Sequence, residues 1–229
     1  MSINIAVSVE GQTEESFINN VLAPYLSKYN IFIEPIIVVT KRTANKSYKG
    51  GTIRFEKFVK DISNLCNPKY HFVTTFYDYY ALQKDFMPSM LSKNVYENVK
   101  LIENKMSIHI NNEKFIPYIQ LHEFETFLFI EPYITANNLF NCNENHVIKK
   151  LSTALHEFQN NPELVNSSSE TAPSKRILSI YPNYQKIFDG INICKNIGVK
   201  KIRECCPHFN NWIESIIKNS NLISQTTLY

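Results

Sequence analysis

The first half of the chain alternates short apolar runs with segments whose apolar residues recur at helical spacing. Ile3, Ile5, Val7 and Val9 alternate with smaller or polar residues, and this period of two predicts a strand. Further strands are predicted over residues 31–40, 71–77 and 115–121, and helices over residues 14–28, 53–65 and 89–105. Strands separated by helices predict an α/β fold with a mostly parallel sheet flanked by helices and right-handed crossovers.

Local signals refine these elements. Thr13 is the expected N-cap of the first helix, and Gly11 is expected to provide a sharp turn before it. Pro24 predicts a kink or a break within that helix, and Pro35 predicts an edge strand or a bulge. The near-continuous apolar run over residues 71–77 is typical of a central strand that is covered on both faces.

The pattern changes after residue 131, where Asn, Ser and charged residues become more frequent and strand-like runs end. Helices are predicted over residues 145–158, 174–180 and 208–218, with a polar loop at 160–173 and a loosely ordered tail at 219–229. We therefore expect two regions: an α/β core over residues 1–131, and a mainly helical region over residues 132–229 that packs on it.

Composition narrows the class of protein. The 229 residues are 44% hydrophobic with 5 glycines, which indicates a globular chain. The formal net charge of +3 is too small to establish nucleic-acid binding by itself. The five cysteines form no C-x-x-C pair, which argues against a disulfide framework or a zinc site. With no signal-peptide pattern and no run of about 18 apolar residues, we expect no membrane span and a cytoplasmic protein.

A basic segment follows the second predicted strand. It holds Lys41 and Arg42, further lysines at 46 and 49, and a pair of glycines, and it is predicted to be a flexible loop. Two interpretations are open: a solvated loop, or a loop that contacts phosphate groups.

Acidic residues end three of the predicted strands: Glu10, Asp78, and the pair Glu123 and Glu125. Because parallel strands end at the same edge of a sheet, these carboxylates are expected to lie close together. Such a cluster repels itself unless a cation neutralises it, and oxygen ligands suit Mg²⁺ or Mn²⁺. This arrangement is typical of metal-assisted phosphodiester cleavage.

Other candidates have plain structural alternatives. Lys175 and Arg176 could stabilise a phosphate or simply begin a solvated helix. His122 lies in an H-E-x-E context that lacks the H-E-x-x-H spacing of a zinc protease, so a supporting or core histidine is the simpler interpretation. Tyr80 could fill the core, stack a base or shape the metal pocket. Glu10 taken alone could be a solvated strand end.

Five short motifs occur in a fixed order along the chain: V-E-G-Q-T-E at residues 9–14, F-Y-D-Y-Y at 76–80, P-Y-I-Q-L-H-E-F-E at 117–125, A-P-S-K-R at 172–176 and C-P-H-F at 206–209. In this order the chain resembles a bacterial family long labelled a domain of unknown function, with a TOPRIM-like fold. That family includes AriB, the effector of the PARIS antiphage defence system. The resemblance covers about residues 9–212.

The resemblance implies a metal-dependent nuclease site. Glu10 matches the glutamate after the first strand of TOPRIM domains, and Asp78 matches the first aspartate of their D-x-D pair. Tyr80 stands where the second aspartate belongs, so Glu123 or Glu125 would have to supply the missing ligand. Glu125 and Lys175 also look like the later glutamate and downstream lysine of related nucleases.

The leading hypothesis is a TOPRIM-type nuclease that uses Mg²⁺ or Mn²⁺ to cleave nucleic acid, with RNA such as tRNA as the expected substrate. Catalysis is assigned to Glu10, Asp78 and Lys175, metal binding to Glu10, Asp78, Glu123 and Glu125, and substrate contacts to Lys41, Arg42, Tyr80, His122 and Arg176. The resemblance further implies a toxic effector that acts with an ATPase partner, and a homodimer suits a symmetric nuclease.

Two other hypotheses remain open. In the first, the TOPRIM-like module has lost its chemistry and serves to bind a partner ATPase. In the second, the protein carries out another phosphotransfer on nucleotides, although no G-x-x-x-x-G-K-[ST] loop is present.

Overall fold

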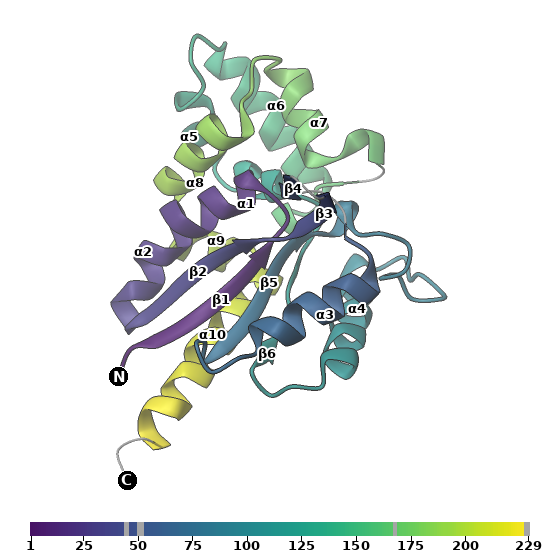
Figure 1. Ribbon diagram of the computed structural model, residues 1–229. Coiled ribbons are helices and arrows are strands. Elements are labelled where there is room, and N and C mark those ends of the chain that lie inside the picture. Colours follow the sequence, from purple (N-terminus) through teal and green to yellow (C-terminus); the bar gives the residue numbers. More distant parts are fainter. Residues whose placement is uncertain (44–45, 50–52, 167–168, 227–229) are drawn as a thin grey trace.

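The protein is built around a twisted parallel sheet with helices against both faces, as the computed structural model in Figure 1 shows. The structure describes residues 1–43, 46–49, 53–166 and 169–226, without the side chains of residues 39–43, 46–49, 169 and 226. The α/β class and the mostly parallel sheet predicted from the sequence are confirmed.

The strands are β1 Ile3–Val9, β2 Ile31–Ile37, β3 Val39–Thr43, β4 Lys46–Lys49, β5 Phe72–Asp78, β6 Phe115–Ile116 and β7 Ile119–Gln120. The α-helices are α1 Gln12–Phe17, α2 Ala23–Leu26, α3 Phe55–Leu65, α4 Val95–Ile110, α5 Pro132–Asn137, α6 Glu144–Glu157, α7 Pro173–Ile180, α8 Ile191–Ile197, α9 Val199–Cys205 and α10 Pro207–Thr226. Two π-helical segments, η1 Ile18–Leu22 and η7 Lys186–Gly190, and five 3-10 segments, η2 Ser27–Tyr29, η3 Tyr79–Ala81, η4 Phe124–Phe129, η5 Pro162–Leu164 and η6 Ser169–Thr171, complete the described elements.

The sheet has the order β2-β1-β5-β6, and β7 pairs with β5 beyond β6. All of these pairings are parallel, so the strands end at one edge of the sheet. β2 is an edge strand, as Pro35 predicts, because the missing N–H of proline is tolerated there. β5 is central and all seven of its residues are buried, as its apolar run predicts.

Alternation along β1 divides the core into two layers. Ile5, Val7 and Val9 point to a large apolar cluster that also contains Phe17 of α1 and Trp212 of α10. Ala6 points to the opposite face, where α3 and α4 pack. Since the first cluster contains residues from both β1 and the C-terminal helices, the helical region after residue 131 packs on the sheet.

The predicted strand over residues 115–121 is wrong in one respect, because it divides into β6 and β7. Pro117 cannot donate a backbone hydrogen bond to the sheet. The Thr75 hydroxyl bridges this interruption: it donates to the Tyr118 carbonyl at 2.6 Å and accepts from the Tyr118 N–H at 3.0 Å. The strand end therefore keeps its alignment with β5 despite the break.

The first helix is broken, as Pro24 predicts: α1 passes through the π-helical segment η1 into α2, and Pro24 lies in the first turn of α2. The N-cap prediction is wrong, since Gly11 rather than Thr13 occupies that position. Gly11 has extended backbone angles, so no left-handed turn requires glycine there. A Cβ atom would instead lie 3.3 Å from Oε2 of Glu14, which indicates that Gly11 leaves room for that carboxylate.

Several other boundaries differ from the sequence predictions. The segment expected to be a basic loop contains the antiparallel strands β3 and β4. The helix predicted over residues 89–105 instead spans Val95–Ile110, because Asn94 caps its start. The tail is helical through residue 226, because α10 continues. The short helices α5, α8 and α9 were not predicted. No helix in the described part of the chain is long and apolar enough to cross a membrane.

Candidate functional site

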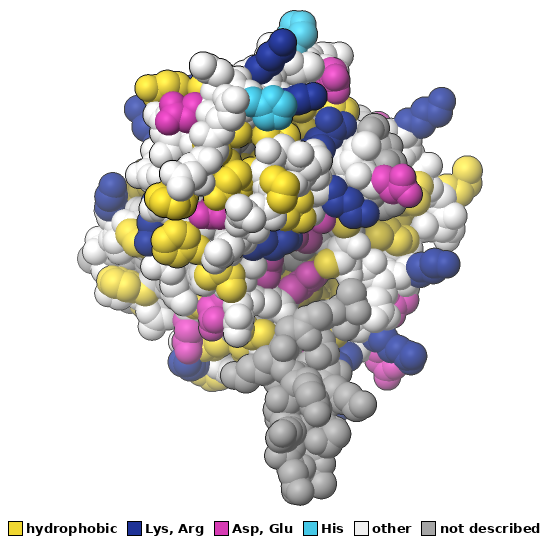
Figure 2. All heavy atoms as spheres, turned by 90° about the horizontal axis from the view of Figure 1, so that it is seen from above, with side chains coloured by type: hydrophobic (Ala, Val, Ile, Leu, Met, Phe, Trp, Pro, Cys, Tyr) yellow, Lys and Arg dark blue, Asp and Glu magenta, His cyan; other side chains and the backbone are white. Residues whose placement is uncertain are grey.

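The carboxyl edge of the sheet brings together the acids that end separate strands. Glu10 follows β1, Asp78 is the last residue of β5, and Glu123 and Glu125 follow β7 at the start of η4. Viewed from above, acidic and basic side chains lie close together near the middle of this face of the molecule (Figure 2). The predicted convergence of acids from distant positions is thus present in the fold.

Asp78 and Glu125 are the most deeply placed of these carboxylates. The Asp78 residue is 8% exposed and Glu125 is fully buried. In the described part of the chain, Oδ1 of Asp78 and Oε2 of Glu125 have no hydrogen-bond partner, whereas Oε1 of Glu125 lies 2.9 Å from Nζ of Lys186. A buried carboxylate oxygen without a partner is costly, so these atoms indicate a place where a cation or water belongs.

The acids interact electrostatically with one another. Burial, followed by the negative charges of Glu14, Glu10 and Glu125, raises the pKa of Asp78 well above its usual range. Burial and the charge of Glu14 raise the pKa of Glu10 to about 8. The cluster therefore disfavours full ionisation unless positive charge is supplied.

Glu14 also belongs to this cluster. From the sequence it was expected only to be an acidic residue in the first turn of a helix, and not a residue of the site. Burial raises the pKa of its carboxyl, while hydrogen bonds from the backbone N–H groups of Glu14 and Gly11 and the charge of Lys186 lower it. The signal was available: Glu14 lies one helical turn after Glu10, at the start of the helix that leaves the same strand.

Lys186 is the second residue that the sequence reasoning missed. Its Nζ lies 2.9 Å from Oε1 of Glu125, with which it forms an ion pair. Burial alone would lower the pKa of Lys186, but Glu125 and the charges of Asp78 and Glu123 raise it. No local sequence pattern identifies this lysine, because its position depends on the packing of η7 against α1 and η4.

Glu123 is held by the protein rather than directed freely into the cluster. Its Oε2 accepts a hydrogen bond from the backbone N–H of Ser174, at 2.9 Å, in the first turn of α7. Lys175, the predicted catalytic lysine, is the next residue of α7 and is exposed. Arg176 is engaged elsewhere: its Nε donates to the Thr171 carbonyl at 2.9 Å, and its guanidinium lies over the ring of Phe158.

His122 and Tyr80 form one wall beside Glu123. Their ring centres are 5.3 Å apart, and the backbone N–H of Tyr80 donates to the His122 carbonyl at 3.2 Å. His122 adopts a left-handed φ of 61°, and its buried Nδ1 has no hydrogen-bond partner in the described part of the chain. Burial lowers the pKa of His122 to about 4, partly opposed by Glu123, so the imidazole is neutral at pH 7. Burial, with Tyr79 and Glu123, raises the pKa of Tyr80 to about 12.

The predicted substrate residues Lys41 and Arg42 lie in β3, opposite Tyr48 and Ser47 of β4. Their side chains are outside the part of the chain that the structure describes, so their predicted contact with phosphate stays a prediction.

Comparison with known proteins places the chain in a family. A family model described as "Domain of unknown function (DUF4276)" matches residues 9–217, which span the chain from before Glu10 to beyond Lys186. The chain belongs to the DUF4276 family. Its description carries no activity, and neither the curated proteins nor the solved structures gave a match.

The carboxylates of this DUF4276 chain suggest a divalent cation, and the oxygens present can be compared with those that Mg²⁺ requires. Within the described residues, no three Asp, Glu, His or Cys side chains are already grouped as a metal site. Mg²⁺, however, is commonly held by one or two carboxylates, with waters and substrate phosphates completing its shell. The partnerless oxygens of Asp78 and Glu125 fit that chemistry, since they are hard anionic donors beside the charges of Glu10 and Glu14.

Proposed function

We propose that the protein is a divalent-cation-dependent phosphodiesterase that acts on nucleic acid, a nuclease of TOPRIM type. The observation that carries the proposal is the buried carboxylate cluster at the sheet edge, in which Asp78 and Glu125 have oxygens without hydrogen-bond partners. Asp78 and Glu125 would hold Mg²⁺ or Mn²⁺, with Glu10 and Glu14 contributing charge around them. When bound, the ion supplies a Lewis acid that activates water and stabilises charge on a phosphate.

The residues of the chain have distinct roles in this proposal. Glu10 has a pKa of about 8, so it can exchange a proton near neutral pH and serve as a general acid or base. In the absence of metal, Lys186 offsets the negative charge of the cluster. Lys175, which is exposed and follows the residue that binds Glu123, would contact a phosphate of the substrate. Tyr80, with its ring facing His122, offers an aromatic surface on which a base can stack.

Cleavage of labelled RNA and DNA, with and without Mg²⁺ or Mn²⁺, tests this proposal. Replacing Glu10 by Gln or Asp78 by Asn should reduce the cleavage rate by roughly 100-fold or more, as expected for loss of acid-base or metal-binding groups. Glu15→Gln is the matched control, because Glu15 is an acid in the same helical turn that exerts none of the charge effects described on Glu10 or Asp78. Undiminished cleavage by both Glu10→Gln and Asp78→Asn would refute the assignment.

The biological setting that we propose rests on the sequence resemblance to AriB-like effectors. In that setting the protein acts in the cytoplasm as a toxic effector on RNA such as tRNA, together with an ATPase partner, as a homodimer. An ATPase gene beside this one, and phage protection that requires both genes and Asp78, would support it. Protection that persists with Asp78→Asn would contradict it.

A second candidate function is a non-catalytic module that binds a partner ATPase. Two observations favour it: Tyr80 occupies the position where a second aspartate is expected, and the described residues contain no preformed group of three metal ligands. Titration calorimetry separates the two functions, because a degenerate site should show no Mg²⁺ or Mn²⁺ binding that depends on Asp78.

A further inference from the structure

The carboxylate cluster already contains one cation, the ammonium group of Lys186. Its Nζ is 2.9 Å from Oε1 of the fully buried Glu125. The same ammonium interacts electrostatically with Asp78 and with Glu14, which come from other elements of the fold. Lys186 thus stands at the point where the negative charges of three segments meet.

A divalent cation held by Asp78 and Glu125 and this ammonium group would both interact with the carboxylate of Glu125. Glu125 has Lys186 as its ion-pair partner, and Asp78 carries a buried oxygen with no hydrogen-bond partner in the described chain. Two cations close together on one pair of carboxylates repel each other. A metal ion and the ammonium therefore compete, even though each alone would stabilise the cluster.

The local structure allows the lysine side chain to leave while its backbone stays in place. Lys186 begins the π-helical segment η7, and the backbone N–H of Gln185, the N-cap residue before it, donates to Oδ2 of Asp189 at 2.8 Å. At Gly190, the last residue of η7, a Cβ would lie 2.5 Å from the Tyr184 hydroxyl oxygen, so this end is tightly packed. The Lys186 side chain, by contrast, is 45% exposed, so it can turn toward solvent without a change in the backbone of η7.

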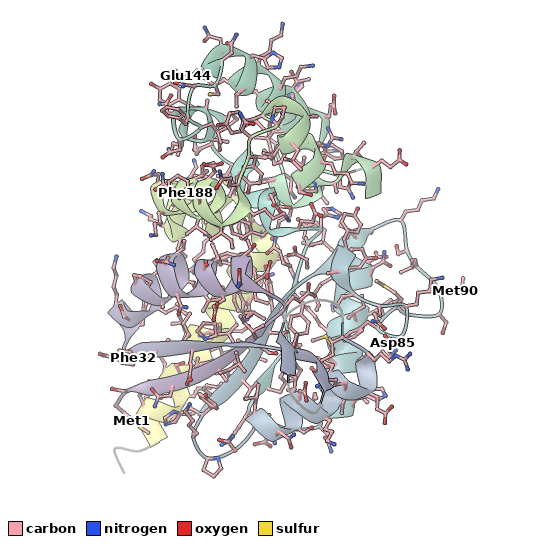
Figure 3. The ribbon with its side chains drawn as sticks, turned by 45° about the horizontal axis from the view of Figure 1, so that its top comes forward. Met1, Phe32, Asp85, Met90, Glu144 and Phe188 are labelled. Carbon is pink, nitrogen blue, oxygen red and sulfur yellow. The ribbon has the colours of Figure 1, made fainter. Side chains whose placement is uncertain are left out.

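The segment η7 lies partly at the surface of the protein. Phe188 of η7, labelled in Figure 3, is 73% exposed, and η7 contacts both α1 and η4, the elements that carry Glu14 and Glu125. Short π-helical segments are rare and recur at functional sites. Here η7 presents a cation to the cluster from a surface segment.

We propose that Lys186 is a built-in counter-ion that occupies the cation position of the cluster and must be displaced before a divalent cation binds. The proposal rests on the proposed function and adds regulation of the same site. It predicts that Lys186 partly neutralises the carboxylate cluster in the metal-free protein. It also predicts that metal affinity is reduced by the free energy needed to separate Lys186 from Glu125. After release, the lysine lies on the solvent side, where a substrate phosphate would approach.

Titration of Mn²⁺ into the intact protein by calorimetry tests this competition without using activity. Lys186→Met, which removes the competing charge at similar length, should lower the Kd for Mn²⁺ by roughly tenfold or more, equivalent to about 1.4 kcal/mol. Lys186→Arg should stay within about threefold of the wild type. Lys195→Met is the control, because it makes the same change in net charge at an exposed position of the adjacent helix α8, and it should leave the Kd within about threefold.

The counter-ion role would be overturned if Lys186→Met bound Mn²⁺ with unchanged or weaker affinity. The proposed function would still stand in that case if the wild type bound Mn²⁺ and Asp78→Asn did not. Absence of binding in both the wild type and Lys186→Met would overturn both. If Lys186→Met does not fold, as judged by circular dichroism, Lys186→Gln provides the same comparison and the same decision.

Discussion

At the scale of single residues, the site depends on carboxylates that modify one another. The charge of Glu14 is the second cause, after burial, of the raised pKa of Glu10. Glu14→Gln should therefore lower the pKa of Glu10 from about 8 toward its ordinary value, as measured by NMR titration of the Glu10 side chain. Glu15→Gln should leave that pKa unchanged. A Glu10 titration that is the same in Glu14→Gln and in the wild type would contradict the arrangement.

The buried His122 and the partly buried His208 give a second prediction at this scale. Burial lowers the pKa of His122 to about 4. Burial would also lower the pKa of His208, but the ion pair between its Nε2 and Oε1 of Glu103, at 3.1 Å, outweighs that effect and raises the pKa. In an NMR titration, the midpoint for the ring protons of His208 should lie above 6.5, and those of His122 should not shift between pH 8 and pH 5. Titration of His122 near its ordinary pKa of 6.5 would show that its ring is not enclosed as described.

The sequence predicts where a residue lies when chain order alone defines its position. Glu10, Asp78 and Glu125 lie at or just after strands, as predicted, and parallel strands end together. Lys186 could not be found, because only the packing of a π-helical turn brings it to Glu125. The wall formed by His122 and Tyr80 likewise depends on a left-handed residue that no local pattern requires.

At the scale of elements, one buried carboxylate fixes the start of α10. Glu163 of η5 accepts hydrogen bonds from the backbone N–H groups of His208 and Phe209, at 3.0 and 2.9 Å, and from the hydroxyl of Tyr96 at 2.9 Å. Glu163→Ala leaves three donors without this acceptor, so we expect a loss of about 2–4 kcal/mol in the free energy of unfolding, measured by urea denaturation. Glu144→Ala, at an exposed helix start, should cost less than about 1 kcal/mol.

A loss below about 1 kcal/mol in Glu163→Ala would show that α10 is held mainly by its apolar contacts. Those contacts are substantial: the Trp212 ring stacks on Tyr118 at 4.2 Å, and its Nε1–H donates to the Thr74 hydroxyl at 2.8 Å. They also explain why the extent of α10 was underestimated from sequence, since its polar C-terminal half carries a weak helical signal by itself.

The strands were the most predictable elements, because the alternation in β1 and the continuous apolar run in β5 both reflect burial within the sheet. The basic segment after β2 was predicted to be a loop because lysines and glycines dominate it, yet β3 and β4 pair with each other there. The short helices α8 and α9 escaped prediction because each has only 7 residues, too few for a clear helical period, and Gly198 with a φ of 81° separates them.

At the scale of the whole molecule, the carboxylate cluster should make stability depend on pH. The pKa of Glu10 is raised from 4.5 to about 8, so between these values the folded protein keeps a proton that the unfolded chain has lost. Without divalent cation, the free energy of unfolding should therefore fall as pH rises from about 5 to 8, and less so in Glu10→Gln. Urea denaturation of both proteins across this range isolates the contribution of Glu10.

The sign of this dependence is the decisive feature. The free energy of unfolding of the wild type could instead rise relative to that of Glu10→Gln as pH increases. That result would mean that the fold stabilises Glu10 as an anion, contrary to the structure. Added Mg²⁺ should offset the fall at the alkaline end, because metal ligands must be deprotonated and binding releases their protons.

The central claim is that acids from three strand ends of a parallel sheet form a site for a divalent cation. Crystals of the protein soaked with Mn²⁺ and measured at an anomalous wavelength test it most directly. We predict an anomalous peak in direct coordination with oxygens of Asp78 and Glu125, with the Lys186 side chain moved away from Glu125. Saturating Mn²⁺ with no peak at these oxygens, and with Lys186 still paired to Glu125, would contradict the account.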